Sequence, residues 1–383
     1  MPKVTALRAA LLLAPALSFC FSWAATADEA EGFGAASRGG SGGRAITVTN
    51  LADDGPGSLR EALEAAGPRR IDFAVEGVIE LASRIVVRHG RVTIDGSTAP
   101  GDGITIARHG IQFVGDCDDI IVRHLRIRVF EGGSSGDSLL FWGRDGGVIE
   151  RVLIDHCSLM WATDENLNTW GDVRDLTCQW TIIAEGQTEA DHAKGSHSAG
   201  WLSGRGSDRV TIHHCLFAHN GDRSPRVAGG VYAFVNNVVY NWTNHNATKV
   251  ADGARIDIVS NYYAPGPQSS ATGACILPAD PHAGTRLYVS GNVTALTPTG
   301  SEDQWPNVTW YERVEDAWVT HRPAPDVFRA SEPFTATPER QQSAEDAYAD
   351  VLARAGAAVR DADDLRVIQE TRDRSGRVGR GNR

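Results

Sequence analysis

The chain has 383 residues, which is enough for one large domain or two ordinary ones. Its formal net charge is −11, which argues against general nucleic-acid binding because a phosphate backbone attracts cations. Gly is abundant, with 41 residues, and Met is scarce, with 2. This composition favours many short strands joined by tight turns over a helical bundle.

The first 27 residues have the pattern of a secretory leader. Lys3 and Arg8 precede an apolar run that reaches about Trp23, and small residues follow at 25–27. The run is shorter than the roughly 20 residues that a membrane span needs. We therefore expect residues 1–27 to be removed and the protein to be secreted, extracellular or periplasmic, with no membrane span in the mature chain.

Five cysteines remain after such a cleavage, and neither their odd number nor their wide spacing fits a disulfide scaffold or a Cys-x-x-Cys zinc site. An oxidising compartment would allow one disulfide, but we expect most of them to be buried thiols. They are Cys117, Cys157, Cys178, Cys215 and Cys275.

A short helix is predicted near the start of the mature chain. Ser58 and Glu61 have the spacing of a capping box, small and apolar residues follow, and Gly67 and Pro68 end the helix. We expect this helix to cover an open end of the structure that follows.

An internal repeat then decides the fold class. Short apolar runs recur with a small or polar residue at one equivalent turn position, every 22 to 34 residues. The series is Leu125, Cys157, Thr181, Cys215, Asn237, Asn261 and Asn292. Such an interval indicates a solenoid in which each coil is one unit and insertions loop out on one side. Coils of three parallel strands make an all-β, right-handed parallel β-helix.

The repeated polar residues predict a ladder inside this solenoid. Asn tolerates the left-handed backbone region and can bond to a neighbouring backbone, so we expect Asn237, Asn261 and Asn292 to stack at the turns. Cys157 and Cys215 hold the same position and are interpreted as small buried groups.

The ladder fades beyond about residue 295. Residues 343–355 predict an amphipathic helix with Tyr348, Val351 and Leu352 on one side and Gly356 as its stop. The charged tail at 360–378 is expected to wrap the wall or to be partly disordered. We therefore predict a β-helix domain at 28–300 and a C-terminal extension at 301–383, packed on the β-helix or partly disordered.

The segment at 210–242, VTIHHCLFAHNGDRSPRVAGGVYAFVNNVVYNW, places cations on a loop between two regular strands. It resembles the catalytic region of the pectate lyases of polysaccharide lyase family one, in which Arg-x-Pro-Arg and Gly precede a strand ending in Asn-Asn. Segment 31–63 resembles the opening of many bacterial members, and the likeness covers roughly residues 31–295. The resemblance implies a parallel β-helix and β-elimination on α-1,4-linked polygalacturonate.

Breaking a uronide chain in this way requires a base for the C5 proton and cations for the C6 carboxylate. Arg223 matches the first Arg of the motif and is expected to be the catalytic base. Arg226 matches the second and should bind a substrate carboxylate bidentately. Lys194 aligns with the lysine that binds the reacting sugar, while Ala228 stands where many relatives have a third Arg.

Calcium is the cofactor that the resemblance implies. Asp137, Asp164 and Asn168 match the family's acidic positions, and oxygen ligands suit this hard ion. Asn168 replaces an Asp, which keeps an oxygen and loses a charge, so we expect weak binding until substrate carboxylates complete the site. Glu165 could contribute instead. The alternative is that these carboxylates only cap turns.

His192 and His197 flank Lys194 and could touch the sugar or share the proton; His192 is predicted to bind substrate. His156, His213 and His214 are expected to be structural, and so is Asp155, whose Ile-Asp-His run matches a buried family carboxylate. Trp161, Trp170 and Trp201 could stack on sugar rings or pack in the core.

The sequence thus predicts a secreted, monomeric, calcium-assisted pectate lyase whose partner is polygalacturonate or pectin, with no nucleic-acid partner. A lyase for methyl-esterified pectin needs no calcium and is disfavoured by Asp137 and Asp164. A galacturonase would carry Asn-Thr-Asp and Gly-His-Gly motifs, which are missing. A non-catalytic carbohydrate-binding solenoid stays open because Asn168 and Ala228 depart from the pattern.

Overall fold

The structure is a computed structural model that describes residues 30–131, 136–190, 192–195, 197–270, 272–279, 284–336, 338 and 341–379. The predicted leader at 1–27 lies outside the described residues and stays a prediction.

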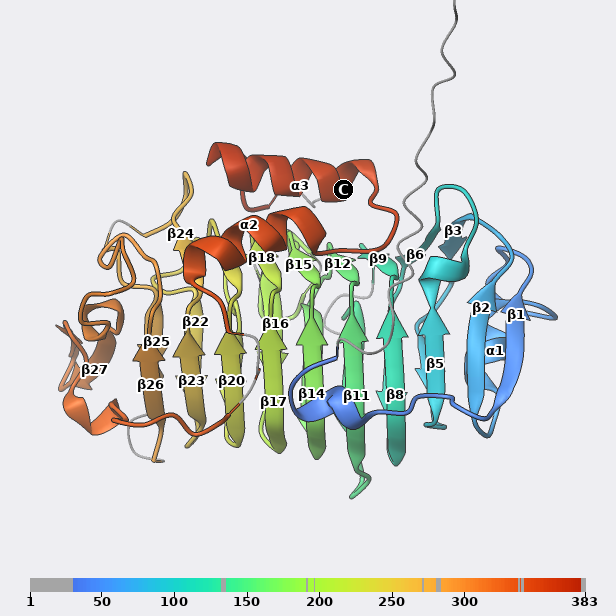
Figure 1. The fold of residues 1–383 in the computed structure, drawn as a ribbon, viewed down its shortest axis with the longest axis horizontal. Coiled ribbons are helices and arrows are strands. Elements are labelled where there is room, and N and C mark those ends of the chain that lie inside the picture. Colours follow the sequence, from blue (N-terminus) through green and yellow to red (C-terminus); the bar gives the residue numbers. More distant parts are fainter. Residues whose placement is uncertain are drawn as a thin grey trace, which may run out of the picture.

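Three parallel sheets wind around one apolar core, and successive strands of the chain pass from the first sheet to the second, to the third and back (Figure 1). The first sheet has ten strands: β1 (Arg44–Val48), β2 (Arg69–Phe73), β5 (Val92–Asp95), β8 (Cys117–Arg123), β11 (Ile149–Asp155), β14 (Val173–Gln179), β17 (Ser207–His213), β20 (Val231–Val235), β23 (Arg255–Val259) and β26 (Arg286–Ser290). The second has eight: β3 (Gly77–Glu80), β6 (Ile104–Arg108), β9 (Arg126–Val129), β12 (Ser158–Met160), β15 (Ile182–Ala184), β18 (Leu216–Ala218), β21 (Val238–Tyr240) and β24 (Tyr262–Ala264). The third also has eight: β4 (Ile85–Val87), β7 (Ile111–Val114), β10 (Leu139–Gly143), β13 (Glu165–Gly171), β16 (Ala199–Ser203), β19 (Arg226–Ala228), β22 (Thr248–Ala251) and β25 (Ile276–Pro278). This is the right-handed parallel β-helix that the repeat predicts.

The predicted ladder is present between the first and second sheets. The backbone N–H of Asn237 donates to Oδ1 of Asn261 at 2.9 Å, and that of Asn261 donates to Oδ1 of Asn292 at 2.9 Å. Gln304 continues the series, because its Oε1 accepts from the N–H of Asn292. These amides are fully buried, so each satisfies backbone groups that no water reaches.

We expected the left-handed backbone conformation at the ladder position itself. The structure places it one residue earlier. Asn236 and Ser260, with φ of 55° and 51°, precede two of the ladder asparagines. The preceding residue makes the turn, and the ladder residue that follows is free to point inward. The five cysteines are buried free thiols, as predicted.

The N-terminal helix α1 (Leu59–Glu64) begins after Ser58, whose hydroxyl accepts from the N–H of Glu61. The Glu61 carboxylate accepts from Gly57 and not from Ser58, so the capping box is shifted by one residue. Leu59 and Leu63 are fully buried in the main core, which closes the end of the stack near β1 and β4.

Two C-terminal helices lie across the second sheet (Figure 1). Helix α2 (Ala344–Arg354) confirms the amphipathic prediction, with Val351 and Leu352 buried. Helix α3 (Ala362–Asp373) shows that the charged tail wraps the wall, where the guanidinium of Arg128 lies 2.9 Å from the carboxylate of Asp364. Neither these helices nor any other in the described part of the chain is long and apolar enough to span a bilayer.

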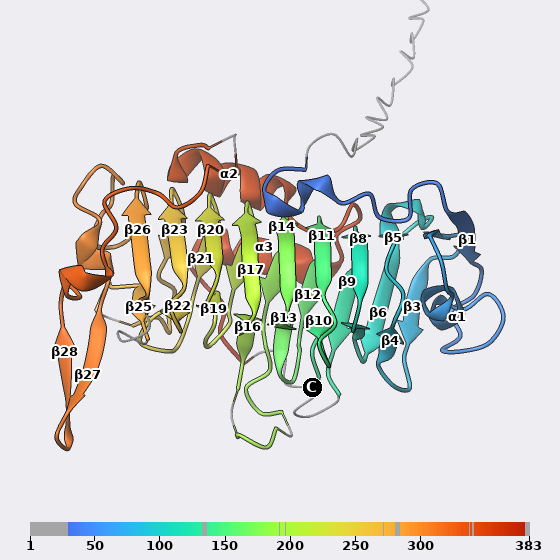
Figure 2. The same cartoon turned by 90° about the horizontal axis from the view of Figure 1, so that it is seen from below.

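The remaining elements are one hairpin and several short helices. The hairpin of β27 (Trp310–Val314) and β28 (Ala317–His321) projects at the C-terminal end of the coils (Figure 2). The 3₁₀ helices within the described residues are η2 (Phe33–Ala36), η3 (Gly96–Thr98), η5 (Trp305–Asn307) and η6 (Asp326–Phe328).

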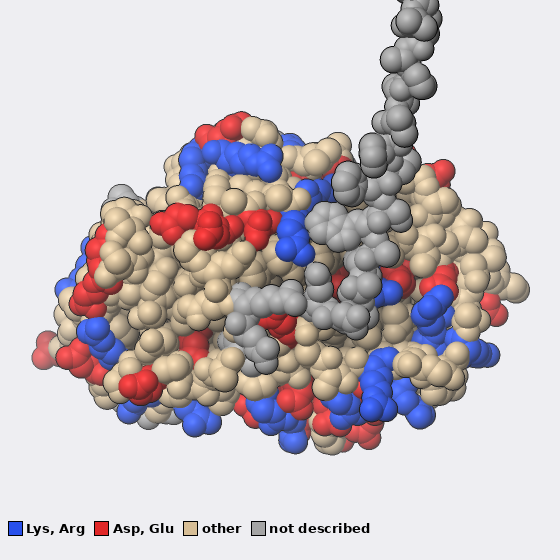
Figure 3. Space-filling model, viewed as in Figure 1, with Lys and Arg blue, Asp and Glu red and all other residues tan. Residues whose placement is uncertain are grey.

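Acidic and basic side chains alternate along the lower edge of the face in Figure 3. Ion pairs between neighbouring strands of the first sheet include Arg151 with Asp118 and Arg209 with Asp175.

Candidate functional site

The predicted site residues meet in the loops that lead from the second sheet into the third. Asp137 lies two residues before β10, Asp164 directly before β13, and Arg223 three residues before β19. Because these strands pair in parallel register, the segments before them stack on one another along the molecule. Residues far apart in the sequence therefore share one row of loops.

Three carboxylates form the centre of this row. Asp137, Asp164 and Glu165 each offer an oxygen, and these oxygens lie within 4.8 Å of one another. The amide nitrogen of Asn168 donates to Asp137 at 3.1 Å and to Glu165 at 3.0 Å. The third oxygen ligand that faces Asp137 and Asp164 is thus a carboxylate oxygen of Glu165, because Asn168 presents its nitrogen to the cluster. The Oδ1 atom of Asn168 has no hydrogen-bond partner among the described residues.

The electrostatics of this cluster favour a cation. Burial and the charge of Asp164 raise the pKa of Asp137 to about 7. Burial also works to raise the pKa of Asp164, but the hydrogen bond from His197 and neighbouring positive charges lower it overall. Buried carboxylates this close repel one another, and an oxygen-binding divalent ion would relieve that repulsion. The donor set therefore fits calcium.

Two histidines hold Asp164. The rings of His192 and His197 stack with centroids 4.1 Å apart, and their Nε2 atoms lie 3.3 and 2.8 Å from Asp164 Oδ1. Lys194 between them is exposed, and its backbone N–H donates to Nδ1 of His192 at 3.1 Å. In this arrangement the histidines orient an acid of the cluster, while the Lys194 side chain stands on the outer part of the loop.

Arg223 joins the cationic side of the site to the acidic side. Its guanidinium forms an ion pair with the buried carboxylate of Glu165, and its backbone has φ of 58°, a left-handed value that non-glycine residues rarely adopt. Burial and the charge of Arg226 lower the pKa of Arg223, while Asp164 and Asp137 act in the opposite direction. Arg223 is therefore held beside the three carboxylates.

A row of register partners with two cations follows on the third sheet. Asn168, Leu202, Arg226 and Lys249 are consecutive register partners on β13, β16, β19 and β22. Lys249 is a cation that our sequence reasoning missed, and its Nζ lies 2.7 Å from the carboxylate of Asp222. Only the strand register places it beside Arg226, and a lone Lys in a strand carries no such signal.

An open cavity of about 300 Å³ lies next to Arg223. It is lined by the loops before β16, β19 and β22, including His197, Asp222 and Asn244. Its lining is mainly polar, which suits a hydroxylated or charged ligand better than an apolar one.

The three tryptophans that could stack on sugar rings differ in their exposure to solvent. Trp201 is fully buried in the core, and Trp161 is buried and donates its Nε1–H to Glu185. Trp170 is 44 % exposed and pairs in register with Trp142 on the next coil. Only Trp170 of the predicted three can therefore present a ring to a sugar, and Trp142 was missed.

The fold and the site together define a parallel β-helix protein with an acidic cluster and a row of cations along one line of loops. No family model matches the chain. In sequence it is similar to the probable pectate lyase C of Aspergillus fumigatus, with 43% identity over 248 residues, which cover 63% of this chain and 55% of that protein. A putative pectate lyase of Arabidopsis thaliana is 35% identical over 154 residues, covering 36% of this chain and 38% of that protein. The chain spans about half the length of the pectate lyase C proteins it matches.

Solved structures agree with this likeness at the level of the fold. The major allergen of cedar pollen, Jun a 1, superposes with a TM-score of 0.61 at 18% identity, covering 87% of this chain and 94% of that one. A pectate lyase of Bacillus sp. N165 in complex with trigalacturonate gives 0.57 at 16%, covering 86% and 99%. Pectate lyase C of Erwinia chrysanthemi, studied at pH 9.5 with 30 mM Ca²⁺, gives 0.54 at 16%, covering 88% and 99%. The chain is therefore a sequence relative of the pectate lyases and has their β-helix fold.

Proposed function

We propose that this protein is a calcium-assisted pectate lyase that cleaves α-1,4-polygalacturonate by β-elimination and releases 4,5-unsaturated oligogalacturonates. The observation that carries the proposal is the ion pair between Arg223 and Glu165, because it joins a buried cation to a cluster of carboxylates in one row of loops. The names of the sequence relatives, and the trigalacturonate bound by one protein of the same fold, support it.

The calcium ligands would be Asp137, Asp164 and Glu165. A half-turn of the Asn168 amide would add its unpartnered oxygen. Calcium takes about 6–8 oxygens, so these side chains leave positions for water and a substrate carboxylate. When bound, the ion would draw electron density from the C6 carboxylate and acidify the C5 proton. The Erwinia chrysanthemi pectate lyase of the same fold was studied with Ca²⁺, which is in line with this assignment.

Arg223 is the proposed base for the C5 proton. A guanidinium ordinarily has a pKa above about 12, so burial, which lowers the pKa of Arg223, works in the direction that this role needs. The ion pair with Glu165 opposes that effect. Glu165 can serve either as a calcium ligand or as the partner of Arg223, and full engagement as a ligand leaves Arg223 less strongly held in its charged form. Alkaline conditions should therefore favour turnover.

Substrate carboxylates would be bound by the row of cations outside this centre. Arg226 lies on the open face of the third sheet beside Lys249, and a planar guanidinium binds a carboxylate through two hydrogen bonds. Lys194 on its exposed loop could close over the reacting sugar, and His192 would steady that loop. These cations give an acidic protein a local attraction for a polyanion.

The remaining expectations belong to the same proposal. We propose that residues 1–27 direct secretion, that residues 28–300 form the lyase domain, that residues 301–383 extend it by packing on the β-helix, and that the protein acts as a monomer. The acidic cluster speaks against an inverting hydrolase, whose two carboxyl groups stand about 6.5–9.5 Å apart, because the oxygens here lie within 4.8 Å of one another.

Two variants test the proposed roles. Arg223→Lys should abolish turnover and leave oligogalacturonate binding largely intact, because the ammonium cannot reproduce the position of the guanidinium nitrogen. Arg226→Ala should raise KM more than it lowers kcat, as expected for a contact made equally in the ground and transition states. The measurement is the rate of ultraviolet absorbance rise from the unsaturated product. If Arg223→Lys retains more than about a tenth of kcat, a loss of only ~1.4 kcal/mol, Arg223 is not the base.

A further inference from the structure

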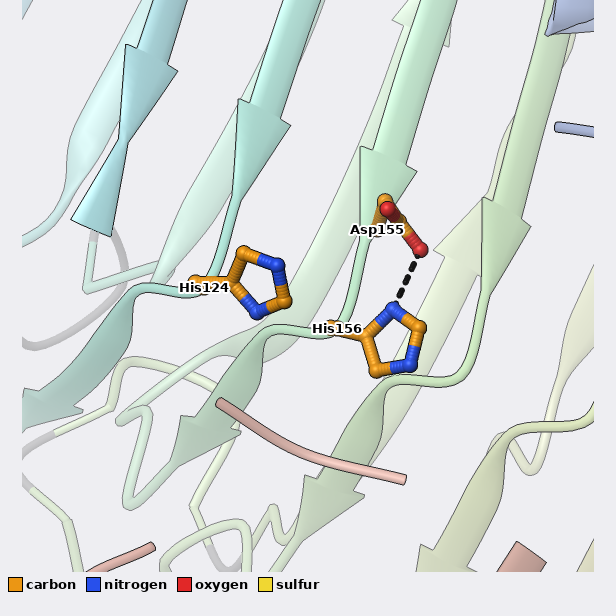
Figure 4. A group of neighbouring side chains, drawn as sticks. All are labelled: His124, Asp155 and His156. Atoms are coloured by element: carbon orange, nitrogen blue, oxygen red, sulfur yellow. Dashed lines mark hydrogen bonds and ion pairs between the residues drawn. The ribbon is translucent and has the colours of Figure 1, made fainter. Parts of the chain in front are cut away.

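A second cluster of potential ligands lies at another corner of the β-helix, where the first sheet turns into the second. His124 directly follows β8, Asp155 ends β11, and His156 follows it. Each offers one nitrogen or oxygen atom, and these atoms lie within 4.8 Å of one another (Figure 4). The proposed lyase chemistry uses none of them.

The coil repeat places these side chains together. His124 and His156 both have left-handed backbones, with φ of 56° and 49°, and both precede a ladder residue on neighbouring coils. The backbone N–H of His124 donates to the carbonyl of Asp155. The ring centroids of His124 and His156 lie 5.2 Å apart. The cluster is therefore built on backbone that the stacked strands hold in place.

One ring nitrogen of the cluster lacks a partner. Nδ1 of His124 has no hydrogen-bond partner among the described residues, although the residue is only 8 % exposed. A buried polar atom of this kind costs free energy unless something satisfies it. The side chains of His156 and Asp155 are 18 % and 15 % exposed, so an ion could enter from solvent.

The other two ligands are already oriented. Nδ1 of His156 lies 2.6 Å from Oδ1 of Asp155, and Gln179 donates to the same oxygen at 3.0 Å. Gln179 is in turn held by Nε2 of His213 at 3.1 Å. Carboxylates and amides that orient a ligand in this way are common around protein metal sites.

We propose that His124, Asp155 and His156 bind a divalent transition-metal ion of the zinc class, which would tie together the coils of β8 and β11. Two imidazoles and one carboxylate suit zinc better than calcium, which prefers oxygen alone. The ion would replace the proton shared by His156 and Asp155, so binding releases one proton. Atoms that share a tetrahedral zinc lie about 3.3 Å apart, so small side-chain rotations must close the present spacing.

Titration calorimetry with Zn²⁺ on the full chain tests this site. His192 and His197 with Asp164 form a second possible zinc cluster, so the background protein carries His192→Gln and His197→Gln, in a buffer with excess Ca²⁺. This background should bind one Zn²⁺. Adding His124→Gln or Asp155→Asn should weaken its affinity at least about tenfold.

His214→Gln is the matched control, because His214 lies in the same column of rings, stacked on Trp180 at 4.3 Å, and its Nε2 is already hydrogen-bonded to Gln342. It should change the zinc affinity less than about twofold. A background protein that binds no zinc, or an affinity that His124→Gln leaves unchanged, overturns the proposal.

A further measurement covers test variants that fail to fold. Cu²⁺ bound to the folded background protein should show paramagnetic resonance coupling to two imidazole nitrogens. A signal with only oxygen ligands overturns the proposal as well.

Discussion

Replacing Asn168 with Asp exchanges two hydrogen bonds for a fourth carboxylate beside Asp137, Asp164 and Glu165. The Asn168 amide donates to Asp137 and Glu165 at 3.1 and 3.0 Å. Hydrogen bonds to charged groups contribute about 1.5–3 kcal/mol each, so their loss costs about 3–6 kcal/mol. Repulsion adds up to about 4 kcal/mol for charges 4 Å apart at an effective dielectric of 20, and proton uptake by Asp137 relieves part of it. We expect the calcium-free variant to be less stable by at least about 3 kcal/mol, the lower value for the lost hydrogen bonds alone.

Calcium should stabilise the Asn168→Asp variant more than it stabilises the wild type. The new carboxylate is a ligand for a hard cation, so Asn168→Asp should bind Ca²⁺ at least about tenfold more tightly, or ~1.4 kcal/mol. The assay is titration calorimetry, with thermal unfolding in chelator and in saturating Ca²⁺. Asn168→Ala is the control, because it loses the same hydrogen bonds without adding a charge. If Asn168→Asp binds calcium no more tightly than the wild type, Asn168 is outside the ligand set.

Three more outcomes are expected. Calcium affinity should fall about tenfold for each pH unit below about 7, because Asp137, whose pKa burial and Asp164 raise to about 7, must lose its proton to bind the ion; calorimetry across that range would show a flat profile if the idea is wrong. In calcium-free protein, raising the pH should lower the stability. The folded-state pKa of Asp137 lies above its ordinary value of 3.8, so the contribution of Asp137 to stability is complete below pH 3.8 and is lost as the pH rises through about 7. Asn261→Ala should lower the free energy of unfolding by about 3 kcal/mol or more, since it leaves buried groups of Asn237 and Phe234 unpaired. An unchanged melting temperature would show that the ladder contributes little.

The coil architecture could be predicted from the sequence because each coil repeats one polar or small residue between short apolar runs. Asn237, Asn261 and Asn292 mark the coils, and the structure stacks them as expected. The preceding residue, which carries the left-handed conformation, varies between His, Trp, Asn, Ser and Gly. No single residue type identifies that position, so its role emerged only from the backbone.

The site could be predicted only in part, because motif matching finds residues and not the directions of their side chains. Asp137, Asp164 and Arg223 meet as expected. The part of Glu165 as partner of Arg223, and the place of Lys249 beside Arg226, depend on loop shape and on strand register between coils. A local sequence pattern contains neither.

The packing of the C-terminal tail could also be predicted only in part. Helix α2 has a continuous apolar side that the sequence reveals, whereas α3 buries little apolar surface beyond Val367 and Ile368. Polar contacts fix α3 as well: Asp364 contacts both Arg128 and the hydroxyl of Ser158 on the wall. A charged segment whose partners lie more than 200 residues away in the chain gives no local signal of packing.

The most direct test of the account is the ultraviolet absorbance of the conjugated unsaturated product when the purified protein acts on polygalacturonate, first with Ca²⁺ and then after exhaustive chelation. We expect the absorbance to rise with calcium, to stop with chelator and to resume when calcium is restored. Reducing ends without any rise in absorbance would indicate hydrolysis. An undiminished rise after chelation would contradict the calcium assignment for Asp137, Asp164 and Glu165.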